Sequence, residues 1–178
     1  MAELTGPGDA TDPGDAPAVW MLAVGQTLGF ASLYYIYGAL LVSVESDTGW
    51  TRASLAIGLT LSLLVSSATV PFAGRLVDRG LGGQLLAGGA LLGGLGLFSL
   101  SQVTTLAGWY GAWACIGLAT AASLYDICFA FLTRRLGGQA RGAIIRVTLV
   151  AGLASTLAFP LGAVLAHDFG WRAAVIAF

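Results

Sequence analysis

The sequence contains no lysine and little charge of either sign. Its eight basic residues are all arginine, its acidic residues number nine, and charged residues make up 10% of the 178 positions, against about 25% in a soluble domain. A chain with so little charge cannot cover itself with a water-facing surface, and it has no basic patch of the kind that binds nucleic acid. We therefore expect lipid to be its main solvent, and we expect no nucleic-acid partner.

Histidine and cysteine are scarce as well, which limits the chemistry that the chain can carry. His167 is the one histidine, and the two cysteines, Cys115 and Cys128, fall within one predicted helix. At about 1.5 Å per residue the cysteines lie roughly 20 Å apart, too far for a disulfide. The sequence offers no ligand cluster for a metal and no nucleophile paired with a base. We therefore expect no cofactor, and we do not expect an enzyme.

Long uncharged runs take the place of charge. Apolar residues make up 57% of the chain, and the mean hydropathy is +0.84. About 20 apolar residues cross a bilayer as a helix, so the charged residues and a turn at Thr104-Thr105 predict five complete spans and the start of a sixth. The expected spans are approximately 17–44, 53–74, 85–103, 107–133, 142–166 and 173–178. The predicted fold class is an all-α polytopic membrane helix bundle.

The charges that remain predict the tail and the orientation. Residues 1–16 are rich in Gly, Pro, Asp and Thr, a composition that favours a disordered tail ahead of a transmembrane bundle over 17–178. The loops after spans two and four hold five arginines, against two in the alternate loops, so the N-terminus and the tail are expected in the cytoplasm of a multi-pass cell (inner) membrane protein. The five are Arg75, Arg79, Arg134, Arg135 and Arg141, and the two are Arg52 and Arg172.

Two stretches of the sequence resemble each other, which indicates an internal repeat. Residues 31–42 and 122–133 agree at seven of twelve positions and share the pattern Ser-Leu-Tyr-x-Ile; after a shift of two residues, Pro71 aligns with Pro160. Span one therefore matches span four, and span two matches span five. A repeat of three spans must be inverted in the membrane, and inverted repeats are typical of secondary transporters. We expect a bundle built as a 3+3 inverted repeat.

The loop between spans two and three carries a more specific resemblance. It reads Gly-Arg-Leu-Val-Asp-Arg-Gly-Leu-Gly over residues 74–82, and it resembles the signature loop of the major facilitator superfamily. The sequences Gly-Trp-Thr-Arg at 49–52 and Gly-Trp-Arg at 170–172 also look like that superfamily. The resemblance extends from about Trp20 to the end of the chain. It implies the N-terminal half of a major-facilitator-type fold.

The resemblance also implies a cytoplasmic gating loop. In the family the loop's aspartate pairs with arginine and with a helix end, and Asp78 and Arg79 would take those roles here, next to Gly74 and Arg75. The family's trailing basic pair falls on residues 83–84, which are glycine and glutamine. We therefore expect the latch to be weaker than in the family or to draw on Arg75.

Asp126 is the one acid well inside a predicted span. A charge there costs about 2.5–3.5 kcal/mol on insertion scales, so it needs a reason. Arg146 enters the next span from the same side, and its side chain can reach the same depth. Two interpretations stay open: a fixed Asp126–Arg146 ion pair that joins spans four and five, or a proton-coupling or substrate-binding carboxylate at a cavity wall. They are compatible, because a buried pair that opens on protonation can relay protons.

A polar stripe runs along span one. Gln26, Phe30, Tyr34 and Tyr37 recur at helical spacing, and Tyr125 aligns with Tyr34 in the repeat. Hydroxyl and amide groups are costly in lipid, so the stripe is expected to face the interior. One interpretation is the wall of a substrate pathway; the other is hydrogen bonding between helices.

Transport of a small solute is the function that these features favour, by alternating access against a C-terminal half missing from this chain. Residues 152–160 resemble bacterial members near the monocarboxylate and oxalate/formate carriers, so organic anions are one candidate solute class, and proton coupling is one candidate mechanism. The monocarboxylate carriers place a lysine in the first span, however, and this chain has none. The expected partners are the lipid bilayer, the solute and the missing half. The alternative is a non-transporting membrane scaffold or assembly protein, which needs no inward polar stripe.

Overall fold

Helices form every regular element in residues 15–178, the part of the chain that the computed structural model describes. The first long helix consists of α1 (Ala16–Phe30), a π-helical turn η1 (Ala31–Tyr35) and α2 (Ile36–Thr48). It is followed by α3 (Arg52–Asp78) and α4 (Gly82–Ser101). The rest is α5 (Leu106–Ser123), α6 (Tyr125–Leu136), the 3₁₀ turn η2 (Gly137–Gln139), α7 (Ala140–Ala151), α8 (Ala154–Phe169) and α9 (Trp171–Ala177).

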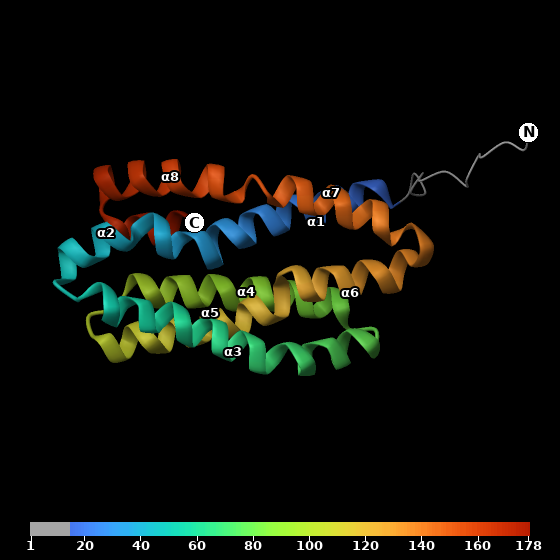
Figure 1. Cartoon of the computed structure of the whole chain (residues 1–178), viewed down its shortest axis with the longest axis horizontal. Helices are drawn as coiled ribbons and strands as arrows, with labels where there is room; N and C mark the ends of the chain where they lie inside the picture. Colours follow the sequence, from blue (N-terminus) through green and yellow to red (C-terminus); the bar gives the residue numbers. More distant parts are fainter. Residues whose placement is uncertain (1–14) are drawn as a thin grey trace, which may run out of the picture.

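Four segments are long and apolar enough to cross a membrane. They are Ala16–Thr48, Arg52–Asp78, Gly82–Ser101 and Leu106–Phe169. The last contains 64 residues, far more than the roughly 20 that one crossing needs. Figure 1 shows it folding back at Gly137–Gln139, so that α6 and α7 run in opposite directions. The predicted all-α membrane bundle is thus confirmed as four to five long apolar helices; the 3+3 inverted repeat stays a prediction.

The helices form two layers. In Figure 1, α1, α2, α7 and α8 make one layer, and α3, α4, α5 and α6 make the other. Within the layers α1 packs against α7, α2 against α8, and α5 against both α3 and α4. The short helix α9 contacts α8 in one layer and α4 in the other.

Glycines bring the helices of the second layer close together. A Cβ added at Gly117 of α5 would fall 2.5 Å from the Ser62 carbonyl oxygen of α3, and one at Gly89 of α4 would fall 2.9 Å from the backbone of Ala122. Small residues allow this backbone approach between membrane helices. The packing surrounds Trp113, which is fully buried.

The loops separate into two groups at opposite ends of the bundle (Figure 1). We call the end with the α2–α3, α4–α5 and α8–α9 connections the tryptophan end, because Trp50, Trp109 and Trp171 lie near these connections. We call the other end, with the α3–α4 and α6–α7 connections, the arginine end. The five arginines that the orientation argument counted on one side lie at this end, in the last turns of α3 and α6, at the start of α7 and at Arg79.

Two predicted spans are interrupted in the structure. The span expected over 107–133 breaks at Leu124, whose backbone is extended (φ −86°, ψ −163°). The span expected over 142–166 breaks at Gly152 and Leu153, between α7 and α8. The expected tail over 1–16 lies outside the described residues up to position 14, and Ala16 already belongs to α1.

Candidate functional site

The first long helix widens at Ala31–Tyr35, where five residues form the π-turn η1. Two hydroxyl groups, one in this turn and one before it, bond back to the helix: Ser32 Oγ donates to the Leu28 carbonyl at 2.7 Å, and Thr27 Oγ1 donates to the Ala23 carbonyl at 2.9 Å. Such bonds compete with the backbone ladder and bend helices. A single π-turn within an α-helix is frequent at functional sites.

The break between α5 and α6 lies beside this turn. Gln26 Nε2 of α1 donates to the carbonyl of Ser123, at 2.7 Å. Ser123 is the last residue of α5. A carbonyl that loses its helical partner inside a membrane protein is costly unless another donor satisfies it, and Gln26 supplies that donor. The Gln26 side chain is only 4% exposed. Its Oε1 atom is buried with no hydrogen-bond partner among residues 15–178, as is Thr120 Oγ1.

The two irregular points fall at corresponding positions of the predicted internal repeat. The π-turn at Ala31–Tyr35 aligns with residues 122–126, and the α5–α6 break at Leu124 falls within them. The stretches that resemble each other in sequence therefore also depart from the α-helix at the same place. Discontinuous helices at corresponding repeat positions are the feature that marks binding sites in secondary transporters.

Aromatic rings connect three helices around these points. We call this set the aromatic ribbon, and its members are Phe129, Tyr125, Phe30, Tyr34, Tyr35 and Phe159. Phe30 and Tyr125 are closest, with ring centroids 4.3 Å apart. The ribbon runs from α6 across the first helix to α8, and its Tyr34 is 40% exposed.

The predicted polar stripe divides at the π-turn. Gln26 is bonded across to α5, and Tyr34 joins the ribbon with Tyr125 two ring contacts away through Phe30. Tyr37 instead packs edge-on against Trp113, at 5.5 Å between centroids. A π-turn holds more residues per turn than an α-helix, so the residues beyond it rotate onto a different face.

Asp126 lies in the first turn of α6, directly after the break, and its side chain is exposed. The N-terminal end of a helix favours a negative charge by about 0.3–1 kcal/mol at an exposed position. Arg146 is half-buried on α7, a helix that contacts α6. The Asp126–Arg146 pair stays a prediction.

The predicted gating loop ends α3. Gly74 and Arg75 lie within the helix, and the Arg75 guanidinium is 5.1 Å from the centre of the Phe72 ring. Asp78 is the last helical residue, and both it and Arg79 are exposed.

The chain then turns at Gly80, whose φ of +87° suits glycine. The Leu81 amide donates to the Leu76 carbonyl at 3.0 Å. These two features set the direction in which α4 leaves the loop.

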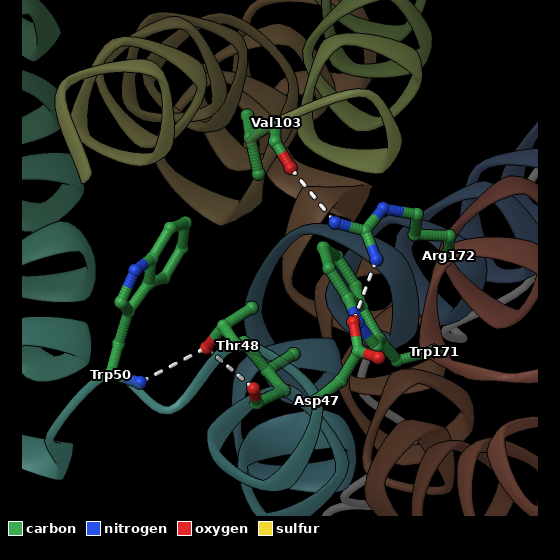
Figure 2. Close-up of polar contacts among 7 residues, drawn as sticks. Asp47, Thr48, Trp50, Val103, Trp171 and Arg172 are labelled. Atoms are coloured by element: carbon green, nitrogen blue, oxygen red, sulfur yellow. Dashed lines mark hydrogen bonds and ion pairs between the residues drawn. The ribbon is translucent and has the colours of Figure 1, made fainter. Parts of the chain in front are cut away.

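A polar network at the tryptophan end was not predicted from the sequence (Figure 2). Asp47 Oδ2, near the end of α2, accepts from Trp171 Nε1 at 2.8 Å and from Arg172 Nη1 at 2.7 Å. Arg172 Nη2 donates to the Val103 carbonyl in the α4–α5 loop at 3.1 Å. One carboxylate and one guanidinium thus join α2, α9 and a loop. The one part of this network that the sequence analysis singled out is the Gly-Trp-Arg motif at 170–172. Asp47, which binds Arg172, lies 125 residues away in the sequence.

The long apolar helices define a multi-pass membrane protein. The family model described as Major Facilitator Superfamily matches residues 22–178, and the chain belongs to that superfamily. The family is one of transporters and not of enzymes.

One curated relative is similar over most of the chain. It is a Thermoproteus tenax protein described as an uncharacterized 38 kDa protein in a 23S RNA operon, 32% identical over 151 residues, which cover 82% of this chain and 39% of the relative. The chain therefore spans about two-fifths of that relative's length. No solved structure was found to match the chain.

Proposed function

We propose that this chain is the N-terminal part of a secondary active transporter that moves a small solute by alternating access. The observation that carries the proposal is the Gln26–Ser123 hydrogen bond of 2.7 Å, because it joins two helices that are irregular at positions that match in the predicted repeat. Secondary transporters place their sites at such interrupted helices, near the bilayer midplane.

The chemistry around this bond favours a solute that carries hydrogen-bond donors or apolar surface. Gln26 Oε1 is a buried acceptor, and a protonated carboxylic acid, hydroxyl or ammonium group would supply the donor. Tyr34 and Tyr125 of the aromatic ribbon add ring faces and hydroxyl groups. We propose the pathway residues Gln26, Tyr34, Tyr125, Asp126 and Arg146, with organic anions as the first solute class to test. Tyr37, the other residue expected from the sequence, packs against Trp113 on a different face.

A second bundle is part of this proposal. The chain covers only 39% of its relative, and transporters of this kind rock two bundles against each other.

A groove of about 290 Å³ lies between α1 and α4 and adjoins Phe178. Glycines 25, 29, 93 and 94 line this groove. Small residues suit close helix packing, so we propose that the remainder of a sixth helix lies in this groove.

Uptake by the full-length protein in proteoliposomes tests the function. We expect radiolabelled oxalate, formate or lactate to accumulate when the outside is made acidic, and a protonophore to abolish the accumulation. Gln26→Leu should lower the initial rate at least tenfold, because it removes both the bond to Ser123 and the buried acceptor. Gln102→Leu, at the exposed end of α4, is the matched control. A folded protein that moves none of these solutes would favour the scaffold alternative.

Proton coupling has its own test. Asp126→Asn should abolish the dependence of uptake on the pH gradient while leaving exchange of solute across the membrane. Asp168→Asn, an exposed acid at the tryptophan end, should leave that dependence unchanged. If Asp126→Asn transports with the wild-type pH dependence, Asp126 has a structural role only.

The gating loop is also part of the proposal. Asp78 and Arg79 would close the arginine end of the pathway, with Gly74 and Arg75 positioning the end of α3. We propose that this end faces the cytoplasm of the inner membrane, as the arginine count indicates. Labelling of single cysteines introduced at Arg79 and at Asp168 by an impermeant reagent, in intact cells and in inverted vesicles, would test the orientation.

A further inference from the structure

A cavity opens at the arginine end, between the α3–α4 loop and the end of α6. Its volume is about 290 Å³. The lining residues are Val77, Gly80, Gly82, Phe131, Arg134 and Arg135. Two of the six carry a positive charge and none carries a negative one, which distinguishes this cavity from the apolar groove beside α1.

The two arginines differ in how their charge is used. Arg135 is held by Asp15 at the start of α1, through Nη2 at 3.0 Å and Nε at 3.2 Å from the same carboxylate oxygen. Arg134 is exposed, and no ion pair joins it to another residue within 15–178. The Arg134 guanidinium is therefore the charge that the cavity leaves available to a ligand.

A glycine and an aromatic ring shape another part of the lining. A Cβ added at Gly82 would fall 2.8 Å from Phe131 Cδ2, so a side chain here would displace the ring. Gly82 is the first residue of α4, and no side chain caps this helix end. Val77 and Phe131 make an apolar surface directly beside the charged groups.

We propose that this cavity binds the phosphate of an anionic phospholipid headgroup. A guanidinium binds phosphate through charge-assisted, often bidentate, hydrogen bonds, and basic pockets between membrane helices at the cytoplasmic side bind anionic headgroups. Free inorganic phosphate shares this chemistry. The lipid is favoured because the cavity lies among the charged loops of a membrane protein and pairs its charge with an apolar wall. This proposal rests on the proposed orientation of the arginine end and not on what the protein transports.

Native mass spectrometry of the full-length protein in uncharged detergent tests the site. Phosphatidylglycerol, phosphatidylcholine and inorganic phosphate would be titrated separately. We expect the first adduct of phosphatidylglycerol to form at lower concentration than that of phosphatidylcholine. Arg134→Gln should weaken this adduct about tenfold, as expected for the loss of a charged hydrogen bond. Arg134→Lys, which keeps the charge, should weaken it by less than Arg134→Gln does.

Arg52→Gln is the matched control, because it removes one exposed arginine at the opposite end. It should bind phosphatidylglycerol as the wild type does. Equal binding by the wild type and Arg134→Gln would overturn the site, as would equal loss in both glutamine variants. If inorganic phosphate binds the wild type and phosphatidylglycerol does not compete with it, the lipid assignment is overturned in favour of a free anion.

Discussion

The two ends of the bundle are built from different chemistry. At the tryptophan end, Asp47, Trp171 and Arg172 satisfy one another, and Trp50 and Trp109 pack as an aromatic pair with centroids 6.1 Å apart. At the arginine end, Asp78, Arg79 and Arg134 are all exposed. The charges of this network are matched to one another at the tryptophan end, whereas at the arginine end Arg135 pairs with Asp15 and the other three charges are open to partners.

This difference indicates that one end of the bundle makes contacts within the chain, whereas the other can make contacts with partners. The network around Asp47 ties α2, α9 and the α4–α5 loop into one unit, which suits an end that moves as a rigid body. The exposed charges at the arginine end are free to contact another bundle, lipid headgroups or water. Arginines on this side also direct insertion, so their excess does not need to be neutralised within the chain.

The largest expected effect comes from overfilling the tryptophan end. Gly58→Ala would place a methyl group against Trp109 and 2.7 Å from Trp113 Cδ1, and overpacking costs about 1–3 kcal/mol. Gly74→Ala, in the same helix near the arginine end, meets nothing within 4 Å. It should be neutral or stabilise the protein by up to about 1 kcal/mol. Thermal unfolding of the purified variants in detergent would measure both. Equal melting temperatures would contradict this account of the α3–α5 contact.

A smaller effect is expected when the shared carboxylate is removed. Asp47→Ala leaves Trp171 Nε1 and Arg172 Nη1 without the acceptor that both use, so the melting temperature should fall by a few degrees. Asp78→Ala, which removes an exposed acid at the arginine end, should leave the melting temperature within error. A larger fall for Asp78→Ala than for Asp47→Ala would reverse the comparison between the ends.

The smallest effect is expected within the tryptophan end itself. Arg52 pairs with Glu45 at 2.7 Å, but its side chain is 66% exposed, and exposed pairs of this kind contribute little. Arg52→Gln should therefore unfold at the wild-type temperature, whereas Arg172→Gln should unfold lower, since Arg172 also binds the Val103 carbonyl. Matching shifts in these two variants would show that the network adds nothing beyond a surface ion pair.

Some of the candidate site followed from the sequence and some could not. The repeat pattern marked residues 31–42 and 122–133, and the structure places its irregular turns inside them. The residue types do not predict a π-turn at Ala31–Tyr35 or a break at Leu124, because neither segment contains a proline or a glycine. The bond from Gln26 to the Ser123 carbonyl at the break forms only when the helices pack.

The positions of Asp126 and Tyr37 illustrate the same limit. The sequence predicts Asp126 in the middle of a helix because it predicts span four as one continuous helix. The break at Leu124 places Asp126 in the first turn of α6. Tyr37 read as part of one stripe because an α-helical period was assumed; the π-turn rotates it toward Trp113. A single irregular turn thus changes which residues share a face.

The sequence by itself determined that lipid is the main solvent and that the fold is helical. It also determined the positions of the loops and the end at which the arginines gather. These properties depend on composition and on the order of residues along the chain, so they can be predicted from the sequence. Only the tertiary structure decided that Gln26 meets Ser123, 97 residues away, and that Asp47 meets Arg172, 125 residues away. Such contacts depend on helix crossing and phase, which are set by packing of the whole bundle rather than by any one segment.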